Sequence, residues 1–334
     1  MIKAGVTGVL LGALLLTIDV HEVIRAIRGI PPGMLALVLV LLVADRVLMG
    51  LKWRQLVNGA GRRLRMRDAV GIYFQSGFAA LLLPTSMGGE VLRGILGPRA
   101  GVPLQLLLPS MVMEKLIAGV SNVTLAVIGA AYVVRATEGE DALVALAVGG
   151  SALVILATLV AAVNRRFHEW IGRWARHWIP ERGFKTLDRF SAGVVGYRQR
   201  KDVLRTNLLL NLAEHLLQFS ALYLLALGLG IDFGLLPFFA VTAVVMLVRR
   251  MVGFLESWWL AETAVVVLYH LFGVPQALSV GLAFALWGTS IVAALPGAYL
   301  LYRHGLDLGD WWSRRLELRR GGEPDLSRIS SPYS

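Results

Sequence analysis

The sequence predicts an all-α integral membrane protein with about six full transmembrane helices and two oppositely oriented re-entrant helical hairpins. Three observations support this: a 56% hydrophobic composition, apolar runs of membrane-spanning length, and the positions of the charged segments between them. Soluble chains average about 25% charged residues, whereas 16% of these residues are charged. We expect one polytopic membrane domain over residues 1–305 and a basic, largely disordered tail over 306–334.

Nine apolar runs give the expected elements in order. A helix needs about 20 residues to cross the hydrocarbon core, and three of the runs are too short for this. The first run is similar to a signal peptide, but no convincing cleavage site follows it, so we interpret it as an uncleaved helix. The short runs are 69–83, 235–250 and 259–271, and the others are 4–20, 32–51, 104–134, 142–163, 206–228 and 277–301.

The charges between the runs predict the topology. Segments 52–67 and 164–205 and the tail after 303 are rich in Lys and Arg, whereas 135–141 is acidic. The positive-inside rule places the basic segments in the cytoplasm, but a full crossing by every run would put 164–205 outside. A hairpin at 69–96 that enters from the cytoplasm, and a second at 235–271 that enters from outside, remove the conflict. Both termini are then cytoplasmic.

The segment 164–205 holds eleven basic residues against four acidic ones. Trp170, Trp174 and Trp178 recur every four residues, on one face of a helix. We predict an amphipathic helix that lies on the cytoplasmic face of the membrane. The net charge of +11 is distributed between apolar spans rather than gathered in a separate basic domain. Nucleic acid is therefore not an expected partner.

The two halves of the chain share a weak internal repeat. The triplet Gly-Val-Pro occurs at 101–103 and at 273–275, in each case eleven residues after a glutamate, Glu90 or Glu262. Three predicted crossings separate the hairpins, so the halves at roughly 30–134 and 206–302 have opposite orientations. Inverted repeats with broken helices are typical of transporters. Two loops that match by chance are the alternative interpretation.

Many ionisable residues fall inside the predicted spans, although each costs roughly 2.5–3.5 kcal/mol to insert. Neighbouring opposite charges point to different faces of a helix, so we expect them to pair with other helices. Structural pairing, snorkelling to the interface and a satisfied interior histidine are the alternatives to a functional role. Snorkelling applies to Asp45 and Arg46, and the satisfied histidine to His215. The secondary site candidates are Asp45, Arg46, Glu214, His215 and Glu256.

The charges of the predicted hairpins are harder to explain by structure alone. Arg249 and Arg250 fall at the tip of the second hairpin, and Glu90 and Arg93 fall just beyond the tip of the first. Broken helices offer unpaired N–H groups that favour an anion, and the arginine fork suits phosphate oxygens. We predict that the two tips meet in the middle of the bilayer and bind a phosphate-bearing head group.

Several kinds of chemistry are not indicated. The sequence has no cysteine, which excludes disulfides, zinc–thiolate sites and thiol catalysis. It has no Gly-rich phosphate loop, no Asp-x-Asp motif in a loop and no His cluster with metal-ligand spacing. The longest stretch between membrane segments is about forty residues, too short for a nucleotide-binding domain. We therefore expect no catalytic residue, no metal and no cofactor.

A Pro-x-x-x-Gly-Gly-Glu-x-x-Arg element covers residues 84–93, with Lys52-Trp53-Arg54 before it and Ser110 to Glu114-Lys115 and Gly119 after it. These residues resemble the transmembrane region of lysylphosphatidylglycerol synthases and its stand-alone, flippase-like relatives. The resemblance implies a protein of the bacterial cytoplasmic (inner) membrane that moves lipids or lipid-linked head groups between leaflets. It implies a site at Pro84, Gly88, Gly89, Glu90 and Arg93, with Glu114 and Lys115 in place of a Glu-Arg pair.

The second half departs from the family pattern. Relatives usually have a Pro and a Gly-Gly-x-Gly run before the glutamate that matches Glu262, whereas residues 256–261 here read Glu-Ser-Trp-Trp-Leu-Ala. The bulky tryptophans would prevent a close approach of the backbone, which puts the family's substrate in question. The sequence contains no soluble aminoacyl-transferase domain, so we do not expect lipid lysylation.

The favoured hypothesis is a lipid translocator of flippase or scramblase type that acts on an anionic phospholipid or a polyprenyl-linked lipid. The alternatives are a membrane-embedded polyprenyl-phosphate glycosyltransferase and a non-transporting scaffold of a lipid-biosynthesis complex. A second copy of the chain and a lipid-biosynthesis enzyme are the protein partners to consider. The residues expected to bind or move the substrate are Pro84, Gly88, Gly89, Glu90, Arg93, Glu114, Lys115, Arg249, Arg250 and Glu262.

Overall fold

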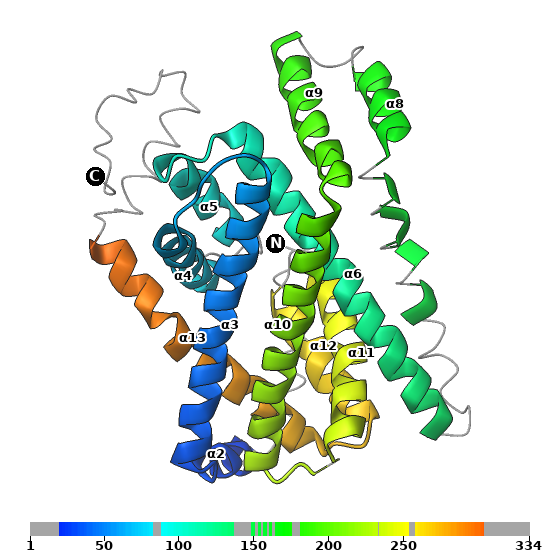
Figure 1. Cartoon of the computed structure of the whole chain (residues 1–334). Coiled ribbons are helices and arrows are strands. Elements are labelled where there is room, and N and C mark those ends of the chain that lie inside the picture. Colours follow the sequence, from blue (N-terminus) through cyan, green and yellow to red (C-terminus); the bar gives the residue numbers. More distant parts are fainter. Residues whose placement is uncertain are drawn as a thin grey trace, which may run out of the picture.

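The regular elements of the structure, a computed structural model, are all helices within the residues that it describes (Figure 1). The predicted all-α class is therefore confirmed. The expected first span at 4–20 and the tail at 306–334 lie outside the described residues, and the span at 142–163 is described only in part. The described residues are 20–82, 88–136, 148–150, 153–154, 156–158, 160–161, 164–175, 181–232, 234–253 and 258–303.

Four helices of the described part are long and apolar enough to cross a membrane. They contain the predicted spans at 32–51, 104–134, 206–228 and 277–301, but α3 ends eight residues later than predicted and α10 begins five residues earlier. A helix of 28 residues is about 42 Å long at about 1.5 Å per residue, which exceeds the roughly 30 Å of the hydrocarbon core. The four helices are α3 (Pro32–Gly59), α6 (Leu104–Ala136), α10 (Lys201–Gly228) and α13 (Gln276–Arg303).

Two pairs of shorter helices occupy the positions of the predicted hairpins. The first pair is α4 (Met66–Leu82) with α5 (Gly88–Arg99), and the second is α11 (Leu235–Gly253) with α12 (Trp258–Leu271). The members of each pair pack against each other. In the second pair the Tyr269 ring, near the end of α12, stacks on Phe238, near the start of α11. The second pair is therefore antiparallel.

The two pairs begin at opposite ends of the molecule, because α3 and α10 are antiparallel. The side chain of Gln55, near the end of α3, donates a hydrogen bond of 2.8 Å to the carbonyl of Val203, near the start of α10. At the other end, a Cβ on Gly228 would meet Ile30. Since α4 follows α3 and α11 follows α10, the pairs start from opposite ends and run toward the middle (Figure 1).

The two halves of the chain have the same order of helices, and the first helix of each short pair packs on the last long helix of the other half. α3 and α10 are each 28 residues long, and each is followed by a helix pair and then a long helix. α4 of the first half packs on α13 of the second, and α11 of the second half packs on α6 of the first. In both contacts a glycine of the long helix, Gly297 or Gly129, leaves no room for a Cβ against the partner's backbone.

The Gly-Val-Pro triplets have the same local structure in both halves. Gly101 and Gly273 have φ angles of 80° and 89°, which glycine adopts without steric cost. The N–H of Val102 donates to Gly97 O, and that of Val274 donates to Tyr269 O, both at 3.0 Å. These are Schellman caps. The end of α10 has the same cap without the triplet. The triplet is therefore only a sign of a helix end, and the evidence that the two halves are alike is their helix order.

The basic segment 164–205 forms more than the single amphipathic helix that the tryptophan spacing predicts. It contains α8 (Arg165–Ala175), α9 (Glu181–Gly196) and a short 3-10 helix, η1 (Tyr197–Gln199). Pro180 lacks the backbone donor that one continuous helix would need. α8 and α9 pack side by side and project beyond the start of α10 (Figure 1), and α9 also contacts α6. A further short helix, α2 (Val20–Arg28), precedes α3 and packs on α13.

The close contact of α13 with α4 gives a testable prediction. Gly297→Ala places a Cβ against the backbone of Phe74, so we expect a loss of about 1–3 kcal/mol of stability from overpacking. The matched control is Gly288→Ala, on the same helix, whose added Cβ meets nothing within 4 Å. Thermal unfolding of the purified variants in detergent measures the effect. Equal melting temperatures for the two variants would contradict the packing of α4 on α13.

Candidate functional site

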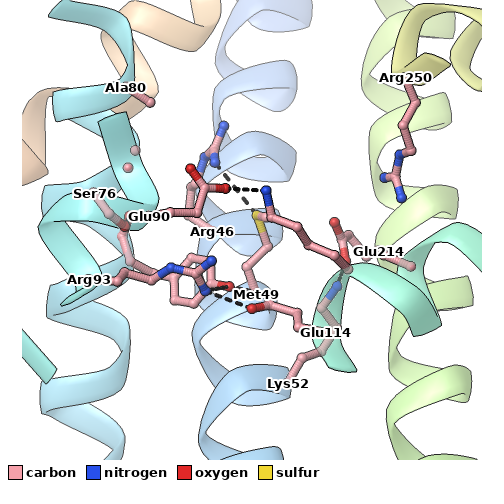
Figure 2. Close-up of a pocket in the computed structure, with 15 residues that line it drawn as sticks. Arg46, Met49, Lys52, Ser76, Ala80, Glu90, Arg93, Glu114, Glu214 and Arg250 are labelled. Atoms are coloured by element: carbon pink, nitrogen blue, oxygen red, sulfur yellow. Dashed lines mark hydrogen bonds and ion pairs between the residues drawn. The ribbon is translucent and has the colours of Figure 1, made fainter. Parts of the chain in front are cut away.

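A cavity of about 300 Å³ lies where the two helix pairs meet the long helices (Figure 2). Six helices contribute to its lining: α3, α4, α5, α6, α10 and α11. Residues from both halves of the chain therefore line one shared space. Its ionisable lining consists of Arg46, Lys52, Tyr73, Glu90, Arg93, Glu114, Lys115, Glu214 and Arg250.

One buried cluster links α5 to α4 and α6. Arg93 Nη1 donates hydrogen bonds to Glu114 Oε2 at 2.6 Å and to the Tyr73 hydroxyl at 2.5 Å. The same hydroxyl donates to Glu114 Oε1. The Arg93 guanidinium also lies 4.8 Å from the Tyr73 ring centroid and 5.8 Å from that of Trp53, within cation–π range. Hydrogen bonds and aromatic rings thus fix the Arg93 side chain, and the Glu114 carboxylate neutralises its charge within the protein.

A second buried ion pair joins α3 to α10. The Lys52 ammonium pairs with the Glu214 carboxylate, and the two side chains are 1% and 4% exposed. Lys52 Nζ also donates to Asn211 Oδ1 at 2.8 Å. The Asn207 amide donates to the Lys52 carbonyl at 2.9 Å. Because both charges are desolvated, each helix depends on the other for a partner.

The third ion pair is the most accessible one. Lys115 Nζ of α6 lies 2.6 Å from Glu90 Oε1 of α5, and their side chains are 51% and 22% exposed. Exposed pairs contribute little to stability because water and salt screen them. Glu114 and its neighbour Lys115 each pair with a residue of α5, so both form the expected ion pair with another helix. Lys115 and Glu90 therefore form the open side of the cavity.

Arg46 and Arg250 bring further positive charge to the cavity, and neither forms an ion pair with a described carboxylate. The three carboxylates of the lining are each paired with another cation of the lining. Arg46 Nη1 lies 3.6 Å from Met49 Sδ, a weak acceptor. Figure 2 shows Arg250 extending from α11 toward the same space. Within the described side chains, the lining has five cationic groups and three carboxylates.

The structure brings together many of the residues that the sequence singles out, and separates others. Gly89, Glu90, Arg93, Glu114, Lys115 and Arg250 line the cavity, as do Arg46 and Glu214 of the secondary candidates. Gly88, Arg249, Asp45 and His215 do not line it. His215 is buried, with its Nε2 3.1 Å from Ser121 Oγ, as the satisfied-histidine interpretation expects. Pro84, Glu256 and the side chain of Glu262 lie outside the described part of the chain.

Lys52 and Tyr73 line the cavity but are absent from the sequence-derived set. Lys52 lies within α3, which continues to Gly59, and its buried side chain pairs with Glu214. The sequence of α10, the helix of its partner Glu214, does contain a sign of this buried polar contact. The polar residues of its apolar run recur at intervals of three and four, which places them on one face. They are Asn207, Asn211, Glu214 and Gln218.

The fold and this cavity define a polytopic helical membrane protein with a charged site that both halves line. The chain matches the family described as the lysylphosphatidylglycerol synthase TM region over residues 1–297. It therefore belongs to that family, as the motifs around residues 84–93 indicate. A search of curated proteins finds no match.

The Lys52–Glu214 pair gives a second prediction. Lys52→Met leaves a buried carboxylate without its cation, so we expect a loss of about 3–5 kcal/mol. The double variant Lys52→Met/Glu214→Gln leaves no unpaired charge and should lose clearly less. Lys115→Met, at the accessible pair, is the control and should change stability by about 0–1 kcal/mol. Thermal unfolding in detergent measures these losses for the double variant and for its two single variants, Lys52→Met and Glu214→Gln. A double variant that lost as much as these two single variants together would contradict the coupling of the pair.

Proposed function

We propose that the protein is a lipid translocator of flippase or scramblase type, which binds the phosphate of an anionic phospholipid or a polyprenyl-linked lipid in this cavity. The observation that carries the proposal is the positive charge of Arg46 and Arg250, neither of which forms an ion pair with a described carboxylate. Membership of a family concerned with membrane lipids supports it. The proposal makes the protein a transporter rather than an enzyme, with no cofactor.

The chemistry of the two arginines favours a phosphate group. A cation in the membrane interior is costly unless it is paired, and a bound anion would supply the missing partner. The guanidinium group donates two parallel hydrogen bonds to the oxygens of one phosphate. Arg46 comes from α3 and Arg250 from α11, so one phosphate held by both would connect the two halves of the chain.

The size of the cavity favours a head group over a whole lipid. Ligand pockets usually measure about 300–1,000 Å³, and this cavity has about 300 Å³. A phosphate with a small polar substituent would fill it, and the acyl or prenyl chains would stay in the surrounding bilayer. The Lys115–Glu90 pair, on the accessible side, is the expected entrance for the head group.

The arrangement of the two helix pairs suggests how the head group crosses. We infer that α4–α5 and α11–α12 are re-entrant hairpins of an inverted repeat, one entering from the cytoplasm and one from outside. Broken helices that meet near the midplane are a common basis of alternating access. Two oppositely oriented pairs around one cavity would let each pair control access from one side. This topology keeps both termini in the cytoplasm and suits a bacterial inner membrane.

Transport in proteoliposomes tests the proposal. The purified protein is reconstituted with fluorescent phosphatidylglycerol, phosphatidic acid and phosphatidylcholine in separate vesicles, and head-group exposure is followed by reduction with dithionite. We expect anionic lipid to move faster than in empty vesicles. Arg250→Gln and Arg46→Gln should each reduce the rate about tenfold or more, since hydrogen bonds to charged groups contribute about 1.5–3 kcal/mol. Arg205→Gln, at an exposed arginine of α10, is the control.

The outcomes separate the proposal from its alternatives. No movement above empty vesicles for any lipid of a broad panel, polyprenyl phosphates included, would refute translocation. Mass spectrometry of the recovered lipid should show an unchanged mass, whereas an added sugar would indicate a glycosyltransferase. Full function in cells of both the Arg46→Gln and Arg250→Gln variants would indicate a scaffold.

A further inference from the structure

Two carboxyl groups from different halves of the chain share one amide beside the cavity. Gln218 Nε2 of α10 lies 3.0 Å from Asp45 Oδ1 of α3 and 3.3 Å from Glu214 Oε1. Both acids are buried, each with 3% of its surface exposed. Glu214 lines the cavity, whereas Asp45 lies behind it. A single neutral side chain therefore connects a cavity carboxylate to a second carboxyl group in the protein interior.

The two acids are each the fourteenth residue of their helix, counted from its start. α3 begins at Pro32 and α10 at Lys201, and the same offset of 169 residues relates Asp45 to Glu214. The residues that follow them, Arg46 and His215, match in the same way. The shared amide thus lies where the halves meet, and each half supplies one acid to it.

Asp45 differs from the other acids beside the cavity because it forms no ion pair with a described cation. Each of the carboxylates at 90, 114 and 214 forms an ion pair, whereas none of the ion pairs between described residues involves Asp45. On its own helix it has Arg46 and Lys52 as charged neighbours. Four helices pack on α3 and could bring charged groups to Asp45. α10 presents Glu214, and α13 has no charged residue before Arg303. The ionisable residues that α4 and α6 bring to the cavity are Tyr73, Glu114 and Lys115.

We propose that Asp45, Gln218 and Glu214 form a proton-binding site that is coupled to the binding of a lipid phosphate in the cavity. A buried carboxylate without a cation is costly, and a carboxyl group removes that cost by taking a proton from water to form an O–H bond. The protonated acid can then donate a hydrogen bond, while the Gln218 carbonyl is an acceptor of the right kind. The proposal rests on phosphate binding in the proposed function, but it does not rest on transport.

The coupling follows from competition for Lys52. A phosphate in the cavity is attracted to the Lys52 ammonium, which also lines the cavity and already has a second partner in Asn211. As Lys52 turns to the phosphate, Glu214 loses its cation. Two buried carboxylates then share one amide, and two like charges at one site favour the uptake of one proton. The proton neutralises one of the acids while the phosphate takes over the cation.

The coupling must act in both directions. If phosphate binding draws in a proton, a lower pH must tighten phosphate binding by the same factor. Between two compartments of different pH, lipid and proton would therefore move together. This would supply the translocator with an energy source, the proton gradient across the membrane.

A proton-uptake measurement tests the inference. The full chain in weakly buffered detergent micelles is mixed with phosphatidylglycerol, and a pH-indicator dye reports the protons taken up per lipid bound, from about pH 5.5 to 8.5. The wild type should take up as much as about one proton per bound lipid, and phosphatidylcholine should cause no uptake. Asp45→Asn should abolish most of the uptake. Asp202→Asn, at an exposed aspartate of α10, should leave it unchanged.

Each outcome has a distinct meaning. Lipid binding with no proton uptake by the wild type at any pH, or uptake that Asp45→Asn leaves intact, would overturn the inference while the proposed function stands. If Asp45→Asn does not fold, Glu214→Gln should reduce the uptake in its place. If no anionic lipid binds, the proposed function fails, and infrared spectroscopy tests the proton site alone. A carboxylic C=O band that titrates in the wild type should be lost in Asp45→Asn or Glu214→Gln, and its absence from the wild type would refute the site.

Discussion

The buried Lys52–Glu214 ion pair is the interaction on which the arrangement of the two halves depends. Water cannot solvate either charge, so α3 and α10 must lie together to pair them. Asn207 and Asn211 extend this polar contact along the same face of α10. Once the two helices are antiparallel, the helix pairs that follow them start from opposite ends. The cavity forms where those pairs meet the long helices.

The same requirement for partners explains the character of the cavity. Arg93 donates hydrogen bonds to Glu114 and Tyr73 and lies over the rings of Tyr73 and Trp53. These contacts hold α4, α5 and α6 together. Arg46 and Arg250 have no such carboxylate among the described side chains. Arg93 is suited to a structural role, whereas Arg46 and Arg250 are suited to binding a negatively charged ligand. On this view the ion pairs build the site, and the two arginines bind in it.

Much of the site could be predicted because the membrane makes ionisable residues conspicuous. Glu90, Arg93 and Arg250 stand beside breaks in apolar runs, and the structure places them around one cavity. The sequence did not predict Lys52 as a site residue because it directly follows an apolar run. At such a position a charged residue of a loop and a buried one look the same in sequence. Asp45 and His215 show the reverse case. They look equally conspicuous, yet they do not line the cavity, whereas their chain neighbours Arg46 and Glu214 do, because neighbouring residues of a helix face different directions.

The sequence by itself determined the membrane class, the long helices and the short helix pairs, because helix length and hydrophobicity are local properties that the bilayer selects directly. It also determined which residues bear charge in the apolar segments. Only the tertiary structure decided which charges neutralise one another and which remain for a ligand. That depends on contacts between helices more than 100 residues apart, such as Lys52 with Glu214 and Asp45 with Gln218, and the spacing along one helix does not contain it.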